Sequence, residues 1–258
     1  MPTLITFIVG LAAGYALAYL ARVLLARRGL LALPQAAAAP APTPAPTPAA
    51  SAGESPEAGD AKAAASAWYA GPTRRRLAAD SAAALLTAAL FAFMHLRFGF
   101  SGAWAIGAVL TALCVLVTIT DLAARIIPNG ALLAFGALLL AAVPFASPEP
   151  LWLHLIGAVS GSGILLLLAV LTSGRGMGMG DVKLLAVLGW VLGFPGVLLA
   201  LFFGSIIGLL AGLLQQASGG NKKRKTIPFG PYLAFGSLIV YMYGKEIIDW
   251  YLTNLIHH

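Results

Sequence analysis

Residues 151–172 read LWLHLIGAVSGSGILLLLAVLT, an apolar stretch without a single aspartate, glutamate, lysine or arginine. An α-helix needs about 20 apolar residues to cross the hydrocarbon core of a bilayer, so this stretch is long enough to span it. It lacks the alternation of apolar and polar residues that a membrane β-barrel strand requires. The stretch therefore predicts a transmembrane helix and argues against a barrel.

The composition of the whole chain agrees with this prediction. Of the 258 residues, 60% are hydrophobic and 10% are charged, whereas an average soluble domain has about 25% charged residues. An ordinary water-soluble globule is therefore excluded. The fold class we predict is all-α, a polytopic membrane protein with about eight transmembrane helices. The apolar blocks that predict them are 4–25, 77–95, 103–120, 128–146, 151–172, 182–193, 196–214 and 231–250.

One predicted crossing, 182–193, is unusually short. Its residues rise only about 18 Å as a helix, against a hydrocarbon core of about 30 Å. Gly193 and Pro195 mark its end, because these two residue types interrupt helices. We expect this helix to be tilted, to share its span with flanking loops, or to be re-entrant.

Between the first two apolar blocks the sequence is nearly all alanine and proline. Such a stretch cannot build a hydrophobic core and is typical of an extended, semi-rigid tether. We therefore predict a transmembrane anchor at 1–28, a disordered cytoplasmic tether at 29–72, a membrane domain at 73–250 and a C-terminal tail at 251–258.

The net charge of +7 has two interpretations, binding to nucleic acid or orientation in a membrane. Basic residues collect in the short cytoplasmic segments of membrane proteins. If the N-terminus lies outside, the cytoplasmic segments are 26–76, 121–127, 173–181 and 215–230, and nearly all basic residues fall in or beside them. Only Arg97 and Lys245 are left for the outer face. The pattern favours orientation and argues against nucleic acid as a partner.

Among the carboxylates expected near the cytoplasmic face, Asp80 suits the start of its helix, where the helix dipole favours an acid. Asp121, at the end of the 103–120 helix, is harder to explain. A carboxylate at the membrane boundary is unfavourable and usually faces the bundle interior for a functional reason. The alternative is that Arg125, four residues later, simply pairs with Asp121 on one helix face, and this segment alone leaves both interpretations open.

Asp181 ends the stretch 174–181, GRGMGMGD. Glycines at alternate positions allow the backbone to break a helix, adopt positive φ and admit another chain closely, which indicates a gap for a substrate. A flexible turn capped by Asp181 is the alternative. A phosphate-binding loop is disfavoured because the Gly-Lys-Ser/Thr order is missing.

A third segment, 225–232, reads KTIPFGPY and precedes the last crossing. Its prolines and glycine stiffen an irregular backbone where we expect the two acids to lie. As an alternative it is only a joint between a loop and a helix, with Pro231 in the first turn.

Three segments together resemble one family. They are the D-x6-P-N segment at 121–129, GMGDVKL at 178–184 and IPFGPYLAFG at 227–236, and they resemble type IV prepilin leader peptidases and their archaeal preflagellin relatives. The resemblance covers about residues 80–245. It implies an aspartic endopeptidase of the cytoplasmic (inner) membrane that removes short basic leaders from prepilin-like proteins, cutting after a glycine at the cytoplasmic face.

The resemblance also implies roles for individual residues. Asp121 and Asp181 match the catalytic pair, and Gly178 and Gly180 match the signature glycines. The candidate substrate-binding residues are Gly178, Gly180, Lys183, Pro228, Gly230 and Pro231. Lys183 and Arg175 flank the glycine stretch and either orient a substrate or mark the topology, the second being favoured.

The chemistry can be argued from the two carboxylates. Two carboxylates in a partly dry site cannot both ionise without a large electrostatic penalty, so we expect the pair to share one proton. The ionised member would deprotonate a water that attacks the scissile carbonyl, while the protonated member donates to the carbonyl oxygen. No metal or cofactor is expected. His95 and His154 fall at the outer face, too far away to act as the base.

The sequence departs from the long bacterial members of the family. Those carry a cytoplasmic N-terminal region, often with paired cysteines, associated with N-methylation of the trimmed pilin, whereas Cys114 is the single cysteine here. We therefore predict a peptidase without its own methyltransferase activity and without the methyl-donor cofactor. The expected partners are prepilin-like substrates and the lipid bilayer.

Three alternatives differ from this interpretation. An ion-coupled transporter also uses membrane acids and broken helices, but near the bilayer midplane. A non-catalytic pilus-assembly scaffold would keep the helices without both acids. A presenilin-type protease shares Gly-x-Gly-Asp, but the Pro-Phe-Gly-Pro segment does not match the Pro-Ala-Leu of that group.

Overall fold

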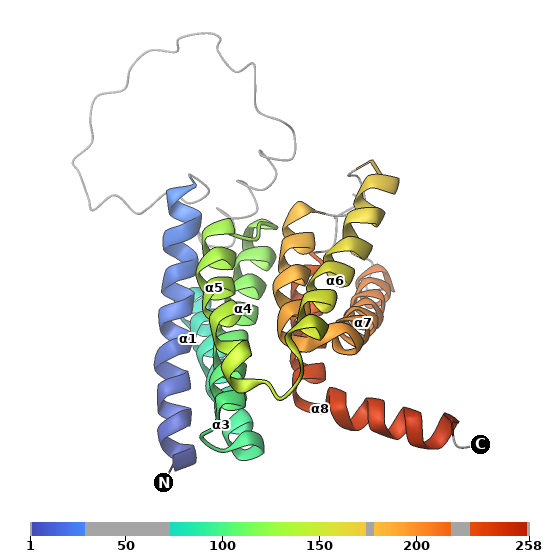
Figure 1. The fold of residues 1–258 in the computed structure, drawn as a ribbon. Helices are drawn as coiled ribbons and strands as arrows, with labels where there is room; N and C mark the ends of the chain where they lie inside the picture. The colour runs from blue at the N-terminus through green and yellow to red at the C-terminus, as the bar shows by residue number, and fades with distance from the viewer. Residues whose placement is uncertain (1, 29–72, 174–177, 218–227, 257–258) are drawn as a thin grey trace, which may run out of the picture.

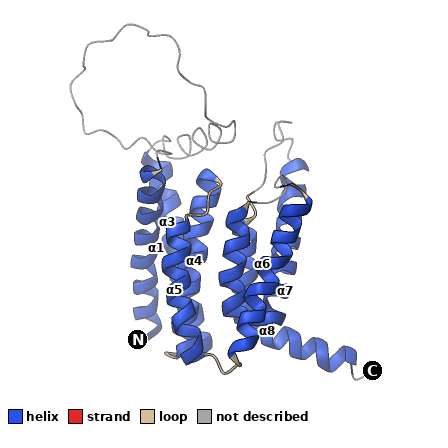
Figure 2. Ribbon diagram, turned by 45° about the horizontal axis from the view of Figure 1, so that its top comes forward, coloured by secondary structure: helices blue, strands red, loops and turns tan. Residues whose placement is uncertain are grey.

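The structure is a computed structural model that describes residues 2–28, 73–173, 178–217 and 228–256. The predicted tether at 29–72 lies outside these ranges, as do Arg175 and the basic run at 222–225. Every regular element in the described ranges is an α-helix, and Figure 2 shows them in one colour. They are α1 (Pro2–Arg27), α3 (Thr73–Phe98), α4 (Gly102–Ala124), α5 (Asn129–Ala146), α6 (Leu151–Leu171), α7 (Met179–Ala217) and α8 (Gly230–Ile256).

Six of these helices are long and apolar enough to cross a membrane by length and composition. They are α1, α3 from Leu77 onward, α4, α5, α6 and α7. The all-α, polytopic membrane fold predicted from the sequence is therefore confirmed. Large apolar side chains on the outside of the bundle, such as Leu133, Phe145 and Leu171, suit contact with lipid rather than water.

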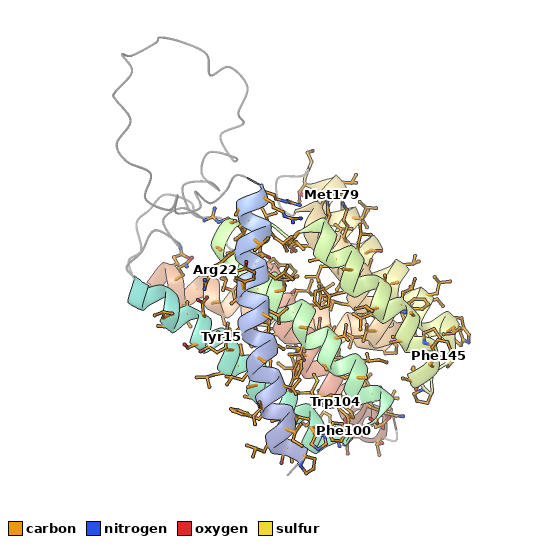
Figure 3. The ribbon with its side chains drawn as sticks, turned by 90° about the vertical axis from the view of Figure 1, so that its left-hand side faces the viewer. Tyr15, Arg22, Phe100, Trp104, Phe145 and Met179 are labelled. Carbon is orange, nitrogen blue, oxygen red and sulfur yellow. The ribbon has the colours of Figure 1, made fainter. Side chains whose placement is uncertain are left out.

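The two ends of the bundle carry different elements (Figure 1). We call one of them the motif end, where α4 finishes and where α7 and α8 begin. The opposite end carries the N-terminus and the last turns of α8. Met179 at the start of α7 lies toward the motif end, whereas Phe100 and Trp104 lie toward the opposite end (Figure 3).

Helix α7 consists of two helical segments joined at Gly193, which has φ 71° and ψ −179°. This is the place where the sequence predicts the short 182–193 helix to end. The first segment starts at the motif end, and the second returns there, because Gly204 and Gly208 contact Leu233 and Tyr232 in the first turns of α8. The predicted crossings 182–193 and 196–214 are thus the two arms of α7.

Helix α8 runs the length of the bundle, from Gly230 beside Asp121 to Tyr241, which bonds Ala103 at the start of α4, but it matches the predicted crossing at 231–250 only in part. It is outside the six candidate spans, and its last turns leave the bundle toward the C-terminus (Figure 1). Beyond Gly244 none of its described side chains is buried. Lys245, Glu246 and Asp249 explain this, since charged side chains are unfavourable in the membrane interior. The helix also continues to Ile256, past the expected start of the tail.

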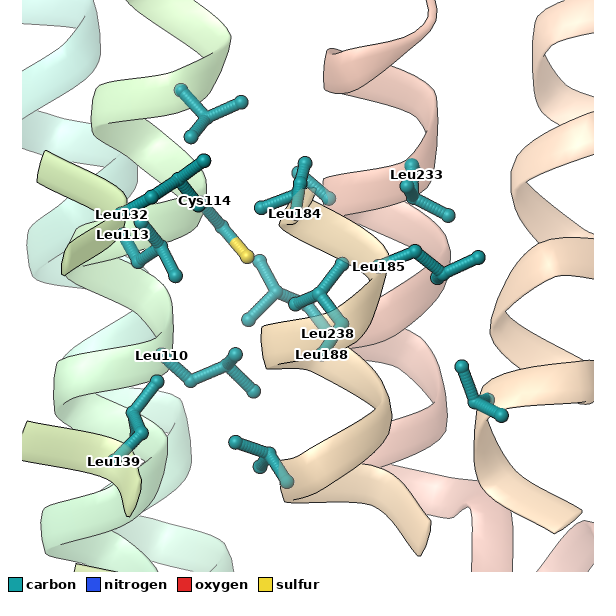
Figure 4. Close-up of a cluster of buried hydrophobic side chains, with 14 of the residues drawn as sticks. Leu110, Leu113, Cys114, Leu132, Leu139, Leu184, Leu185, Leu188, Leu233 and Leu238 are labelled. Carbon is teal, nitrogen blue, oxygen red and sulfur yellow. The ribbon is translucent and has the colours of Figure 1, made fainter. Parts of the chain in front are cut away.

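The hydrophobic core joins α4 and α5 to α7 and α8. Leu110, Leu113 and Cys114 of α4 face Leu184 and Leu188 of α7 (Figure 4), while Leu185 lies against Gly161 of α6. Most of these side chains are fully buried. The first arm of α7 is therefore the central element of the bundle, and its position fixes where Asp181 lies relative to α4.

Helix α1 packs tightly on α3. A Cβ at Gly14 would lie 2.4 Å from the Cα of Ala84, so only glycine permits this approach. Arg22 of α1 forms an ion pair with Asp80 of α3, and the hydroxyl groups of Tyr15 and Ser81 are 3.1 Å apart. Asp80, expected only to suit a helix start, thus joins α1 to α3.

Candidate active site

The three sequence segments that carry the family resemblance meet at the motif end (Figure 1). Asp121 lies in the last turn of α4, Asp181 in the first turn of α7, and Gly230 begins α8. These positions are far apart in the chain. The bundle topology brings them together because α4 ends at the same face from which α7 and α8 start.

Asp121 is buried, with 6% of its surface exposed. The backbone N–H of Gly230 donates a hydrogen bond of 3.0 Å to its Oδ2 atom. A Cβ at position 230 would lie only 2.7 Å from that oxygen. Glycine therefore allows the start of α8 to approach the carboxylate and fix its orientation with a buried backbone donor.

Arg125 follows Asp121 and ends α4 in the left-handed conformation, with φ 53°. Its backbone N–H donates to the carbonyl oxygen of Asp121 at 2.8 Å. Its side chain is exposed but close enough to interact electrostatically with the Asp121 carboxylate. Asp121 therefore has two partners. Arg125 is close in the sequence, and Gly230 comes from a distant segment.

Asp181 is half-buried in the first turn of α7. Its backbone N–H donates to the carbonyl oxygen of Gly178 at 3.1 Å. Its carboxylate interacts electrostatically with that of Asp121. The two acids that the sequence singled out therefore lie at the same end of the bundle, at the end of α4 and the start of α7.

The signature glycines act differently from the sequence prediction. Among the described glycines, positive φ occurs at Gly99 and Gly193, so Gly178 and Gly180 do not use the conformational freedom that the sequence allows them. Gly180 lies inside the first turn of α7, where a Cβ would come within 3.1 Å of the Ile127 Cβ. Its small size lets the turn after α4 pack on α7, which holds Asp181 near Asp121. Gly178 is exposed and has room around it.

Lys183 forms a contact that the sequence did not predict. Its Nζ donates a hydrogen bond of 3.2 Å to Oδ1 of Asn129 at the start of α5. The asparagine was part of the D-x6-P-N pattern, so the pattern marked the residue but not its partner. The bond joins the starts of α5 and α7 beside the carboxylates.

In the Pro-Phe-Gly-Pro segment, the carbonyl oxygen of Phe229 accepts hydrogen bonds of 3.1 Å from the N–H groups of Tyr232 and Leu233. This starts α8, with Pro231 buried in the first turn. Gly230 is also buried, against Asp121, while Pro228 is half-buried before the helix. The geometry thus assigns Gly230 to the positioning of Asp121 and leaves Pro228 the more accessible of the two prolines.

The two described histidines, His95 and His154, lie away from the two acids. His154 is buried at the start of α6, where its ring bonds the carbonyl oxygen of Trp190 and the hydroxyl of Ser147. His95 is buried near the end of α3. Within the described ranges, no group of three or more histidine, cysteine, aspartate or glutamate side chains is placed to hold a metal ion.

A helical bundle that crosses a membrane several times and holds two interacting carboxylates at one end is a polytopic membrane protein with a paired-carboxylate site. Comparison with known proteins identifies the group. Residues 108–213 match the model of the type IV leader peptidase family. This match includes both Asp121 and Asp181.

Individual relatives give the same result, each named prepilin leader peptidase/N-methyltransferase. The Bacillus subtilis protein is 39% identical over 171 residues, which cover 66% of this chain and 68% of that protein. The Neisseria gonorrhoeae protein is 32% identical over 177 residues, 66% of this chain and 60% of its own length. The Aeromonas hydrophila protein is 40% identical over 105 residues, 39% of this chain and 36% of its own. No solved structure matches significantly. The chain belongs to the type IV leader peptidase family and is a peptidase.

Proposed function

We propose that this protein is an aspartic endopeptidase that removes the short basic leader from prepilin-like proteins, cutting after glycine at the cytoplasmic face of the inner membrane. The observation that carries the proposal is the convergence of Asp121 and Asp181 at one end of the bundle, where Gly180 packs on Ile127 after α4 and Gly230 bonds Asp121. The printed names of the relatives supply the substrate class.

The mechanism follows from a shared proton. One carboxylate, in its ionised form, takes a proton from a water molecule, which attacks the scissile carbonyl. The other carboxylate, in its protonated form, donates to the carbonyl oxygen, and protons then return to the leaving amine. The Gly230 N–H fixes the orientation of Asp121. The Asn129–Lys183 bond joins the start of α7 to α5, and the Ile127–Gly180 contact packs α7 on the turn after α4.

The test replaces each acid by its uncharged isostere. Asp121→Asn and Asp181→Asn should each lower the rate of leader removal from a co-expressed prepilin by about 10²–10⁴-fold, the usual contribution of general acid–base catalysis. Both variants should still insert into the membrane. The exposed Asp249 of α8 lies at the opposite end, so Asp249→Asn is the matched control and should cleave normally. Normal cleavage by either active-site variant would show that Asp121 and Asp181 are not the catalytic pair.

We also propose that the protein does not methylate the trimmed pilin. Its single cysteine, Cys114, is buried in the core, so the cysteine pairs of the methyltransferase-associated region have no counterpart in the sequence. When this enzyme alone processes a pilin, mass spectrometry should find an unmethylated N-terminus. A product heavier by one methyl group would contradict this.

The transporter alternative has less support. Coupling-ion sites of transporters lie near the bilayer midplane, whereas Asp121 and Asp181 lie at a helix end and a helix start on the same side of the bundle. The scaffold alternative requires the loss of an acid, and both are present. Cleavage by the wild-type protein and its loss in the asparagine variants would separate the proposed peptidase from both alternatives.

A further inference from the structure

A cavity of about 250 Å³ lies at the opposite end of the bundle, away from the two acids. It is lined by the end of α3, the start of α4, the end of α5, the first arm of α7 and the second half of α8. Its walls are mostly apolar and include Phe98, Ile106, Val143, Val191 and Met242. An apolar cavity of about 150 Å³ already binds benzene, so this one has room for a short length of hydrocarbon.

The rim of the cavity is charged. Arg97 and Lys245, both exposed, line it together with Glu246. Arg97 forms an ion pair with Glu246, and its guanidinium lies 6.0 and 5.9 Å from the ring centres of Phe98 and Tyr243. The Lys245 side chain makes no hydrogen bond or ion pair with the described residues. Glu246 neutralises Arg97, so the rim has a net charge of one positive unit, from Lys245.

These two cations are the exceptions to the charge pattern of the chain. The other basic residues fall in or beside the segments expected in the cytoplasm, and those with described side chains lie at the motif end. Orientation alone does not account for cations at the opposite end. Both exceptions line the same cavity, where Arg97 is paired with Glu246 and the Lys245 charge is left for a ligand.

The polar groups inside the cavity are already satisfied. The Tyr241 hydroxyl donates to the carbonyl oxygen of Ala103 at 2.6 Å, and the Ser147 hydroxyl bonds His154 at 2.9 Å. A ligand therefore meets an apolar interior and finds its polar partner at the rim. An amphiphile with a hydrocarbon chain and an anionic headgroup has this distribution.

We propose that this cavity binds one anionic phospholipid of the outer leaflet, with part of an acyl chain between α4, α5 and α8 and the phosphate beside Lys245 and Arg97. A phospholipid is the occupant that the surroundings favour, because an apolar interior adjoins a rim with an excess positive charge at one end of a bundle of candidate membrane spans. Basic residues near that surface attract anionic lipid headgroups.

The experiment measures lipid retained by the full-length protein. Protein purified in a neutral detergent is delipidated and incubated with equal amounts of phosphatidylglycerol and phosphatidylcholine, and bound lipid is counted by native mass spectrometry. The wild-type protein should retain one phosphatidylglycerol in preference to phosphatidylcholine. Lys245→Gln should lower this occupancy about fivefold, as expected for one cation near an anionic headgroup.

Two further variants make the result specific. Ala103→Phe fills the cavity from α4 and should lower the retention of both lipids. Arg27→Gln removes one exposed positive charge at the motif end and should bind lipid like the wild-type protein. Lys245 is exposed, so its variant tests the proposal even if the Ala103 variant does not fold.

Three outcomes would overturn the proposal: equal retention of the two lipids by the wild type, unchanged retention in Lys245→Gln, or an equal loss in Arg27→Gln. Displacement of the lipid by free glycerol phosphate at the same concentration would also overturn it. The site would then bind a soluble phosphate rather than a lipid.

Discussion

At the scale of single residues, Gly230 and Asp121 form the contact on which the site geometry depends most directly. A buried carboxylate needs a hydrogen-bond partner, because leaving it unpaired is unfavourable. The structure provides a backbone N–H from the start of α8. Because Gly230 has no side chain, its N–H can reach the Asp121 carboxylate. A residue with a Cβ at this position would push the carboxylate away.

We predict that Gly230→Ala lowers cleavage by about 10²-fold, since a misplacement near 1 Å at a catalytic group has effects of this size. The added Cβ would lie 2.7 Å from Oδ2 and 3.2 Å from Cγ of Asp121. The short side chain of Asp121 must then rotate or α8 must shift. The loss should fall mainly on kcat, measured with a prepilin leader substrate in detergent.

Gly130→Ala is the matched control. Gly130 lies in the first turn of α5, near the same end of the bundle, and a Cβ there would meet nothing within 4 Å. This variant should cleave at the wild-type rate. If Gly230→Ala also cleaved normally while remaining folded, the proposed role of the Gly230 N–H would be wrong.

At the scale of elements, the break in α7 determines how a single helix serves two crossings. Gly193 combines φ 71° with ψ −179°, a region of backbone conformation available essentially only to glycine. Three residues before the break, the carbonyl oxygen of Trp190 accepts a hydrogen bond of 2.8 Å from Nδ1 of His154. The buried histidine of α6 thus stabilises the bend.

We predict that Gly193→Ala lowers the free energy of unfolding by about 1–3 kcal/mol, the usual penalty for such a backbone conformation outside glycine. Space is not the reason, because the nearest atom to an added Cβ is the Leu153 carbonyl oxygen at 4.0 Å. Denaturant titration in detergent measures the change. The cleavage rate of the folded fraction should stay close to the wild-type rate, since Gly193 is far from the two acids.

Gly163→Ala tests whether any glycine-to-alanine change has this effect. Gly163 lies within α6, and a Cβ there would also meet nothing. In an ordinary helix interior the change should be neutral or stabilising by up to about 1 kcal/mol. Equal stabilities of the two variants would contradict the strain assigned to Gly193.

The sequence predicted many of the helix bounds correctly. They depend on the lengths of the apolar blocks and on the positions of glycine and proline, which are local properties of the sequence. The break at Gly193 and the starts and ends of α5 and α6 fall close to the predicted positions. The departure of α8 from the bundle was not predicted, because the apolar residues around Lys245 and Glu246 concealed the change of environment. Contacts such as Lys183 with Asn129 depend on which helix ends meet, which no local pattern specifies.

At the scale of the whole molecule, two ends of one bundle have different roles. The motif end holds the paired acids, and the opposite end holds the cavity with its charged rim. The sequence placed Asp121 and Asp181 on one face because an even number of crossings separates them, and the structure places them together for this reason. Their approach still required the packing of α7 on α5 and α8, which both pack on α4, and a crossing count does not provide this.

Cysteine labelling can determine which end faces the cytoplasm. Glu149 and Thr172 are exposed and flank α6 at its two ends, and the native Cys114 is 1% exposed, so it should contribute little background. In spheroplasts, a membrane-impermeant maleimide should label Glu149→Cys directly and Thr172→Cys only after permeabilisation. The reason is that Arg27, Arg125 and Lys183 lie at the motif end, and basic residues are retained in the cytoplasm. The reverse labelling would place Asp121 and Asp181 outside the cell, where a cytoplasmic leader could not reach them.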